Sequence, residues 1–131
     1  MQGLHLTADL HGCRPASALM TEPEVLRRHC LAAVMAAGLQ PVGELFHRFA
    51  PGPGATVAPP GVTGVVLLAE SHLAVHTWPE LGAATLDVYV CNFGADNSAR
   101  AARLLSALLA DFAPATSQRQ ALRRGAAVHP D

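Results

Sequence analysis

The sequence predicts an α+β protein, a two-layer α/β sandwich in which an antiparallel sheet carries helices on one face. Several short segments alternate apolar and polar residues, as half-buried strands do. Two longer segments repeat apolar residues at helical spacing and lie among these strands. The chain has 131 residues, which suits one domain, so we expect residues 1–131 to form a single unit.

The first predicted elements are a strand and a helix. Residues 2–10 alternate leucine or alanine with smaller or polar residues, which predicts a strand. Thr21 is expected to cap a helix, with Pro23 in its first turn and Glu24 completing a capping box. Gly38 is expected to end that helix after Ala37, in a left-handed conformation. The buried face of this helix is predicted to carry Leu26, His29 or Cys30, Val34 and Ala37.

The remaining elements follow in the order strand, strand, strand, strand, helix, strand. Between the first two, residues 50–61 contain four prolines and three glycines and predict an irregular loop. The second helix is expected to begin at Asn97 or Ser98 and to reach Asp111. The strands are predicted at 42–49, 63–69, 73–78, 83–91 and 115–124, followed by a loose tail.

Composition excludes several classes of function. All nine basic residues are arginine, so lysine-based pyridoxal-phosphate chemistry and a lysine-bearing phosphate loop are excluded within this chain. The net charge of −1 provides no basic field for nucleic acid or lipid head groups. No apolar run is long enough to span a membrane, and the N-terminus lacks signal-peptide features. Three widely spaced cysteines suit reduced thiols. We therefore expect a cytoplasmic protein without nucleic-acid or membrane partners.

Reactive side chains gather in a segment that otherwise has core character, residues 70–80, with Cys91 following on the next strand. A metal site at His72, His76 and Cys91 is one interpretation, but the usual zinc-ligand spacings are absent, so no metal is expected. A serine hydrolase is a second, but Ser71 lacks the Gly-x-Ser-x-Gly turn. The third is self-processing, in which Ser71 attacks the Glu70 carbonyl and becomes a pyruvoyl group.

Specific motifs identify a resemblance. The segments Glu70-Ser71-His72 and His76-Thr77-Trp78-Pro79-Glu80 closely resemble the short prokaryotic S-adenosylmethionine decarboxylases, as do residues 61–66 and 87–91. Residues 46–49 and the opening strand with His5 are similar to the same family. The resemblance covers about residues 3–112. It implies a pyruvoyl-dependent carboxy-lyase that is made as a proenzyme and decarboxylates S-adenosylmethionine for spermidine synthesis.

The resemblance also implies roles for single residues. Ser71 is the pyruvoyl precursor, and autocatalytic cleavage at Glu70–Ser71 yields chains 1–70 and 71–131. The pyruvoyl ketone then condenses with the substrate amine as a Schiff base. His76 corresponds to the processing base, and Cys91 to the acid that protonates the substrate carbon after decarboxylation. Thr63 stands where the family usually has a serine that assists processing. Each role has a structural alternative. Ser71 could be an ordinary turn serine, His76 a hydrogen-bonded core histidine, and Cys91 an inert buried thiol.

Three residues match family positions that bind the substrate. The rings of Phe46 and Phe49 would contact the adenine or the sulfonium, and the Glu80 carboxylate would bind the ribose hydroxyls. Phe46 and Phe49 are three residues apart on one strand, so we expect one of them to belong to the core. Glu80 could equally be a solvated turn carboxylate. The resemblance further implies a homodimer whose sites lie at or near the subunit interface.

The sequence also departs from the family pattern, at Thr63, at Asn92-Phe93-Gly94, at Leu81 and Ala83, and in the longer 50–61 loop. These departures surround the substrate end of the pocket. Two other functions therefore stay open: a pyruvoyl-dependent decarboxylase of arginine or ornithine, and an uncleaved regulatory homologue.

Overall fold

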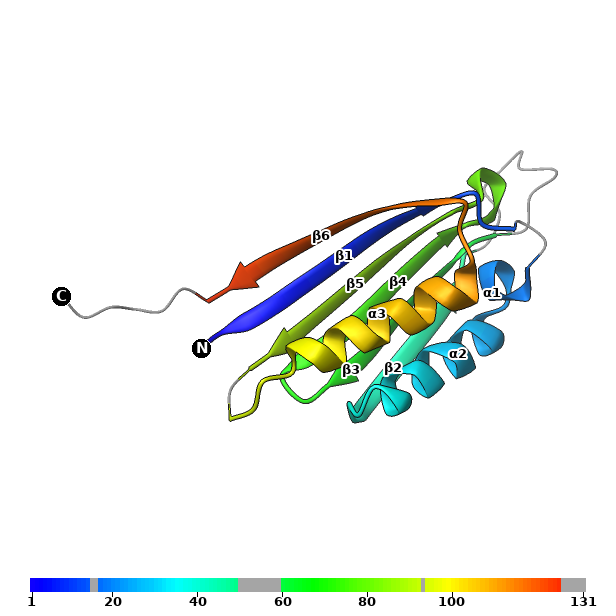
Figure 1. Ribbon diagram of the computed structural model, residues 1–131. Coiled ribbons are helices and arrows are strands. Elements are labelled where there is room, and N and C mark those ends of the chain that lie inside the picture. The colour runs from blue at the N-terminus through cyan, green and yellow to red at the C-terminus, as the bar shows by residue number, and fades with distance from the viewer. Residues whose placement is uncertain (15–16, 50–59, 93, 126–131) are drawn as a thin grey trace.

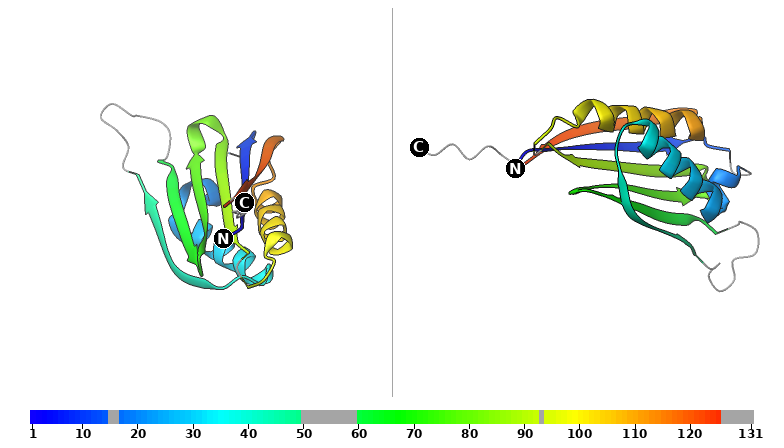
Figure 2. Two further views of the ribbon diagram at one scale, coloured as in Figure 1. Left: turned by 90° about the vertical axis from the view of Figure 1, so that its left-hand side faces the viewer. Right: turned by 90° about the horizontal axis from the view of Figure 1, so that it is seen from below.

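The computed structural model describes residues 1–14, 17–49, 60–92 and 94–125. One antiparallel sheet of six strands, in the order β2-β3-β4-β5-β1-β6, has its helices on one face (Figures 1 and 2). The predicted α+β class, with an antiparallel sheet covered on one side, is confirmed. The elements are β1 Gly3–His11, α1 Ala18–Thr21, α2 Pro23–Ala36, β2 Pro41–Arg48, β3 Val62–Leu68, β4 Ser71–Trp78, η1 Pro79–Leu81, β5 Ala83–Cys91, α3 Ser98–Phe112 and β6 Thr116–Arg124.

Strand alternation gives the sheet two different faces. Along β4 and β5 every second residue is buried against the helices, as Leu73, Val75, Leu86 and Val88 are. The intervening residues lie on the opposite face, which the described helices leave uncovered and which we call the open face. The core thus lies between the sheet and the layer formed by α2 and α3, where Leu26, Val34, Leu104 and Leu108 are fully buried.

The start of α2 differs from the prediction. Thr21 is the last residue of a short helix, α1, and Glu22 holds the N-cap position without a side-chain capping bond. The Glu22 carboxylate instead accepts a hydrogen bond from Arg48 on β2, at 2.7 Å. The capping-box prediction was therefore wrong, because Thr21 belongs to α1 and the Glu24 carboxylate accepts a hydrogen bond from Arg27 Nη1 at 3.1 Å.

The other end of α2 is as expected. Ala37 is the C-cap, and Gly38 follows with a left-handed φ of 83°. On the helix itself Cys30 is buried, but His29 is exposed and its Nδ1 lies 3.0 Å from Asp111 Oδ2 on α3. The prediction left open whether His29 or Cys30 lies on the buried face, and Cys30 does.

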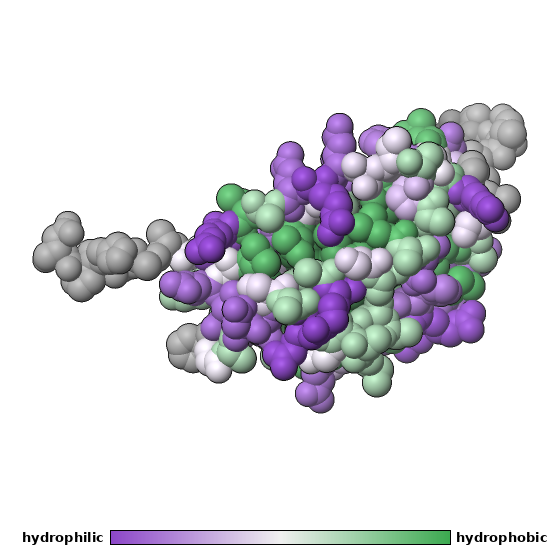
Figure 3. Space-filling model, in the orientation of Figure 1, coloured by the Kyte–Doolittle hydropathy of each residue, from purple (hydrophilic) through white to green (hydrophobic). Residues whose placement is uncertain are grey.

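The irregular loop predicted at 50–61 lies outside the described residues except for its last two positions. The final strand is confirmed as β6, which pairs with β1 and is exposed along its whole length. Figure 3 shows the helix-bearing side of the molecule, where hydrophilic side chains surround a central band of apolar residues. No described helix is long and apolar enough to cross a membrane.

Candidate active site

Ser71 and Cys91 are neighbours at the end of the sheet where β1 begins and β6 ends (Figure 1). Ser71 opens β4 directly after a two-residue turn from β3, and the turn residue Glu70 has a left-handed φ of 55°. The backbone N–H of Cys91 donates a hydrogen bond to Ser71 Oγ at 3.1 Å. The Cys91 side chain is 8% exposed. A nucleophilic hydroxyl, its preceding carbonyl and a thiol thus share one corner of the sheet.

His76 and Thr63 form a second pair. They are directly opposite each other on β4 and β3, and Thr63 Oγ1 lies 2.9 Å from His76 Nδ1. In the neutral histidine tautomer with a proton on Nδ1, Nδ1 donates to the threonine and Nε2 is left as a base. Both side chains are half-buried on the open face. This pair has the chemistry of an oriented general base.

The two pairs lie far apart in one chain. Ser71 and His76 are five residues apart on the same strand, which separates them by about 17 Å. A general base has to reach its proton within hydrogen-bonding distance or through one water. The structure therefore joins Ser71 to Cys91 and Thr63 to His76, but it does not bring His76 to Ser71 within one protomer.

The three predicted substrate-binding residues are placed differently from one another. The Phe46 ring lies over Gly64 on the helix-bearing side and packs against the core. Phe49 is 50% exposed, and its ring lies edge-on to His47, with ring centroids 4.9 Å apart. The expectation that only one of the two phenylalanines belongs to the core is confirmed. Glu80 is exposed in η1, at the same end of β4 as His76.

The open face is polar next to the Ser71–Cys91 end of the sheet, where His72, Tyr89 and His5 stand at paired positions of β4, β5 and β1. His5 Nε2 lies 3.1 Å from Asp87 Oδ1, and the rings of His5 and His72 both lie beside Tyr89. The Arg124 guanidinium lies over the Tyr89 ring, 5.8 Å from its centroid. These contacts of Asp87 and Tyr89 were not predicted, because an alternating strand presents a polar side chain at every second position whether or not it has a function.

Asn97 also lies near the site, and no sequence pattern indicates this. It was expected only as a helix cap, yet its side-chain amide donates to the Cys91 carbonyl oxygen at 2.9 Å. Asparagine is common at helix N-termini for a local reason. A tertiary contact of the same side chain is therefore hidden in the sequence.

The three thiols differ in their surroundings. Burial, together with the charge of Asp111, raises the pKa of the Cys30 thiol to about 12. Burial also raises the pKa of Cys13. Neither lies in the candidate site, whereas Cys91 lies beside Ser71. Within the described ranges, no three histidine, cysteine, aspartate or glutamate side chains are grouped as metal ligands.

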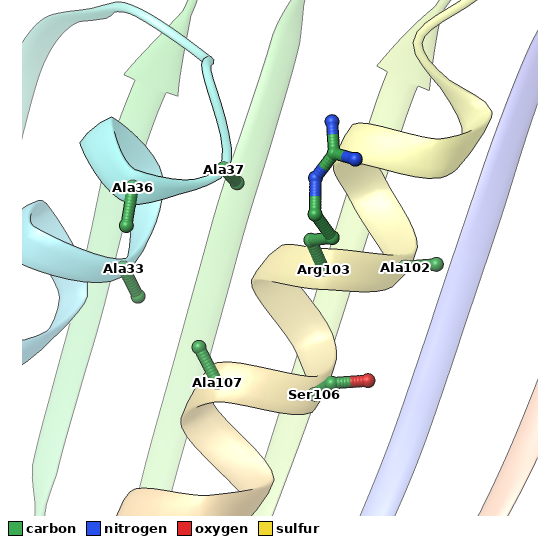
Figure 4. Close-up of a pocket in the computed structure, with 7 residues that line it drawn as sticks. All are labelled: Ala33, Ala36, Ala37, Ala102, Arg103, Ser106 and Ala107. Carbon is green, nitrogen blue, oxygen red and sulfur yellow. The ribbon is translucent and has the colours of Figure 1, made fainter.

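A shallow groove between α2 and α3 lies on the opposite side of the helices from the sheet (Figure 4). It is apolar apart from Arg103 and Ser106, and none of the predicted site residues lines it. Its remaining lining consists of alanines: Ala33, Ala36, Ala37, Ala102 and Ala107.

Comparison with known proteins agrees with the motifs. Residues 4–125 match the S-adenosylmethionine decarboxylase family. S-adenosylmethionine decarboxylase proenzymes of Aquifex aeolicus and Archaeoglobus fulgidus are 36% and 33% identical over 94% of this chain, covering 81% and 97% of their own lengths. The relative from Acetivibrio thermocellus is 37% identical, but the match spans only 64% of its length.

The fold is shared as well. The crystal structure of the Aquifex aeolicus adenosylmethionine decarboxylase superimposes with a TM-score of 0.81 and 33% identity, covering 98% of this chain and 95% of that one. These relatives favour neither an arginine or ornithine decarboxylase nor a regulatory homologue. Sequence motifs, family match and fold agree, and the chain belongs to the S-adenosylmethionine decarboxylase family.

Proposed function

We propose that this protein cleaves itself between Glu70 and Ser71 and then decarboxylates S-adenosylmethionine. The observation that carries the proposal is the contact between Ser71 Oγ and the Cys91 N–H in a chain of this family. A donor at Oγ stabilises negative charge on that oxygen. This charge develops twice: when the hydroxyl loses its proton to attack the Glu70 carbonyl, and when the same oxygen later leaves Cβ.

The cleavage is a sequence of balanced steps. Ser71 Oγ attacks the Glu70 carbonyl carbon, the peptide C–N bond breaks, and an ester with a free Ser71 amine results. Removal of the Ser71 α-proton expels the Glu70 carboxylate from Cβ and leaves a dehydroalanyl residue. Water then replaces the nitrogen, ammonia is released, and chain 71–131 begins with a pyruvoyl group. In this scheme His76 takes the α-proton, and Thr63 holds its ring.

The residues present suit a pyruvoyl group. Ser71 follows a tight turn, its Oγ is held by a main-chain donor, and the chain has no lysine that could supply an alternative amine. The pyruvoyl group supplies an electron-withdrawing carbonyl with which the substrate amine can combine. Cys91, whose main-chain N–H bonds to Ser71 Oγ, is assigned as the proton donor through its thiol. Phe49 and Glu80 are the side chains that we assign to the nucleoside end of the substrate.

The separation of the two pairs supports a homodimer. His76 is about 17 Å along the strand from Ser71 in its own chain, so a second copy has to provide the base if His76 acts on Ser71. A two-fold axis over the open face brings the Thr63–His76 end of one copy to the Ser71–Cys91 end of the other. The same operation creates two equivalent sites, because a two-fold interface is self-complementary.

The composition of the open face supports the same arrangement. Leu45, Leu67, Trp78 and Leu122 all belong to this face and are between 38% and 70% exposed. Leu67 and Leu122 flank the polar row of His72, Tyr89 and His5 across the sheet. Several exposed apolar side chains on one sheet face are typical of a surface that another protein covers.

The first experiment is intact mass measurement of the purified protein. We expect two fragments, 1–70 and 71–131, in the wild type and one full-length chain in Ser71→Ala. The cleaved protein should release CO2 from S-adenosylmethionine and yield its decarboxylated product, the aminopropyl donor for spermidine. Equal or faster release from arginine or ornithine would contradict the assigned substrate, and an uncleaved wild type would exclude the mechanism.

A mixing experiment tests the composite site. Ser71→Ala has no nucleophile, and His76→Ala has no base, so neither should be cleaved alone. After co-refolding, a mixed dimer contains one site with both an intact Ser71 and an intact His76 from the other copy. We expect the His76→Ala chain to be cleaved in the mixture. If neither chain is cleaved although mixed dimers form, the two residues do not act across an interface.

A further inference from the structure

Asn97 lies at the N-terminus of α3, where the chain leaves β5. Its Nδ2 donates to the Cys91 carbonyl oxygen at 2.9 Å, and its Oδ1 accepts from Arg100 Nη1 at 2.8 Å. Its backbone N–H donates to Asn92 Oδ1, also at 2.9 Å. The amide group therefore has a donor and an acceptor partner, and only one orientation of the amide satisfies both.

The Asn97 side chain does not serve the helix on which it lies. It occupies the N-cap position of α3 but makes no capping hydrogen bond. Asp96 accepts from the Ser98 N–H instead, at 2.9 Å, and this bond lowers the pKa of the Asp96 carboxyl. Asparagine normally stabilises a helix by capping it. Here the neighbouring aspartate provides an acceptor, and the asparagine amide points to the strand of the candidate site.

Arg100 keeps that amide in place. The arginine lies one turn into α3 and next to Gly38, where an added Cβ would lie 3.3 Å from Arg100 Nε. Arg100 is thus packed against the end of α2 as well as bonded to Asn97. The contact connects the helix layer to the last residue of β5.

The main chain of Cys91 makes two hydrogen bonds to side chains, one to Asn97 at the start of α3 and one to Ser71 on β4. Its carbonyl accepts from Asn97, and its N–H donates to Ser71 Oγ. We propose that Asn97 is a positioning residue that fixes the Cys91 main chain, and through it both Ser71 Oγ for self-cleavage and the Cys91 thiol for turnover. This role rests on the proposed function, because both reacting groups are assigned there.

The expected effect follows from the donor that the amide provides. Asn97→Asp keeps the size and shape of the side chain but places a carboxylate oxygen against the Cys91 carbonyl oxygen. Two acceptors then face each other, so the main chain of Cys91 shifts. We expect self-cleavage to slow by about tenfold or more, since a single hydrogen bond is worth a factor of roughly 2–12 and the substitution adds repulsion. Asn97→Ala, without the repulsion, should slow cleavage about fivefold.

The substitution to aspartate also separates positioning from helix stability. Aspartate is as good an N-cap as asparagine and suits the positive end of a helix. A purely structural role therefore predicts normal cleavage in Asn97→Asp. A positioning role predicts slow cleavage in a variant that still folds and unfolds cooperatively, which is measured in the uncleavable Ser71→Ala background.

The experiment follows fragment formation by intact mass in the full-length wild type, Asn97→Asp, Asn97→Ala and Arg100→Met. Ser98→Ala is the matched control, because it removes a neighbouring hydroxyl that accepts from Asn92 but leaves both side-chain bonds of Asn97 in place. We expect the control to cleave like the wild type and Arg100→Met to be slower than the control. In the cleaved fraction kcat should fall for Asn97→Asp with KM unchanged, since Cys91 is assigned to proton delivery and not to binding.

Each outcome has a separate meaning. If the wild type cleaves and the folded asparagine variants cleave at its rate, Asn97 has no positioning role and the proposed function stands. If Asn97→Asp is unfolded, the folded Asn97→Ala and Arg100→Met variants decide, and normal rates in both overturn the proposal. A wild type without cleavage overturns the proposed function and this role together.

Discussion

Thr63 Oγ1 and His76 Nδ1 lie 2.9 Å apart at directly paired positions of β3 and β4. Adjacent strands fix this distance, because the backbones that carry the two side chains are bonded to each other along the sheet. The histidine ring is therefore oriented before any partner or substrate is present. The Thr63 hydroxyl is therefore held where it can bond to the ring.

Removal of the Thr63 hydroxyl should slow self-cleavage. Thr63→Val keeps the β-branched shape but cannot bond to His76, so the ring loses its fixed orientation. We expect a rate lower by about 2- to 12-fold, the usual value of one hydrogen bond, and Thr63→Ser should restore it. Fragment yield against time is the measurement, and equal rates for valine and threonine would remove Thr63 from the processing machinery.

A charge on the open face should prevent dimer formation and cleavage together. Leu67 is 50% exposed on this face, and Leu67→Glu would place a carboxylate in the proposed interface. We expect a monomer in sedimentation or light scattering and an uncleaved chain by mass. Met35→Glu is the matched control, because Met35 is similarly exposed but lies on α2. A monomeric Leu67→Glu protein that still cleaves would show that one copy is sufficient.

Most of the fold follows from local patterns. The strands and both long helices are predictable because alternation and helical spacing report which face of each segment is buried. The start of α2 was not predictable in this way. Helix α1 is only four residues long, and its Ser17 cap was not recognised. Glu22 bonds to Arg48, which is 26 residues away. Contacts of this kind depend on the tertiary arrangement and leave no local pattern.

The candidate site was predictable as a set of residues and not as an arrangement. The motifs name Ser71, His76 and Cys91, and one strand carries the first two. Their separation of about 17 Å follows once the segment is a continuous strand. The bond from Asn97 to the Cys91 carbonyl could not be predicted, since it needs the path of the β5–α3 connection.

Gly64 should be intolerant of a side chain. A Cβ at this position would overlap the Phe46 ring, which covers it from β2. Gly64→Ala should lower the free energy of unfolding by about 1–3 kcal/mol, the usual cost of overpacking. Urea unfolding in the Ser71→Ala background measures the change, and Phe46→Leu should recover part of it. Gly43→Ala is the control, because its Cβ would meet only Leu67 Cδ1 at 3.7 Å. Equal losses in both variants would show that Phe46 is not the cause.

The buried thiol of Cys30 should make the protein less stable in alkaline solution. Burial, and secondarily the charge of Asp111, raises its pKa from 9.0 to about 12 in the folded protein. Between pH 9 and 12 the unfolded chain releases this proton and the folded chain retains it. The folded state then binds more protons than the unfolded state, so the free energy of unfolding falls as the pH rises, by about 1.4 kcal/mol per pH unit at most.

Cys30→Ala should remove that pH dependence without removing the fold. The variant loses some stability at every pH, because removal of the thiol leaves a small space in the core. Its free energy of unfolding should nevertheless fall less steeply between pH 9 and 10.5 than that of the parent. Urea unfolding of both proteins in the Ser71→Ala background, at one protein concentration, gives the two curves. Other groups that titrate in this range are common to both chains, so the difference between the curves reports Cys30. Parallel curves would show that the Cys30 thiol titrates alike in the folded and unfolded chains.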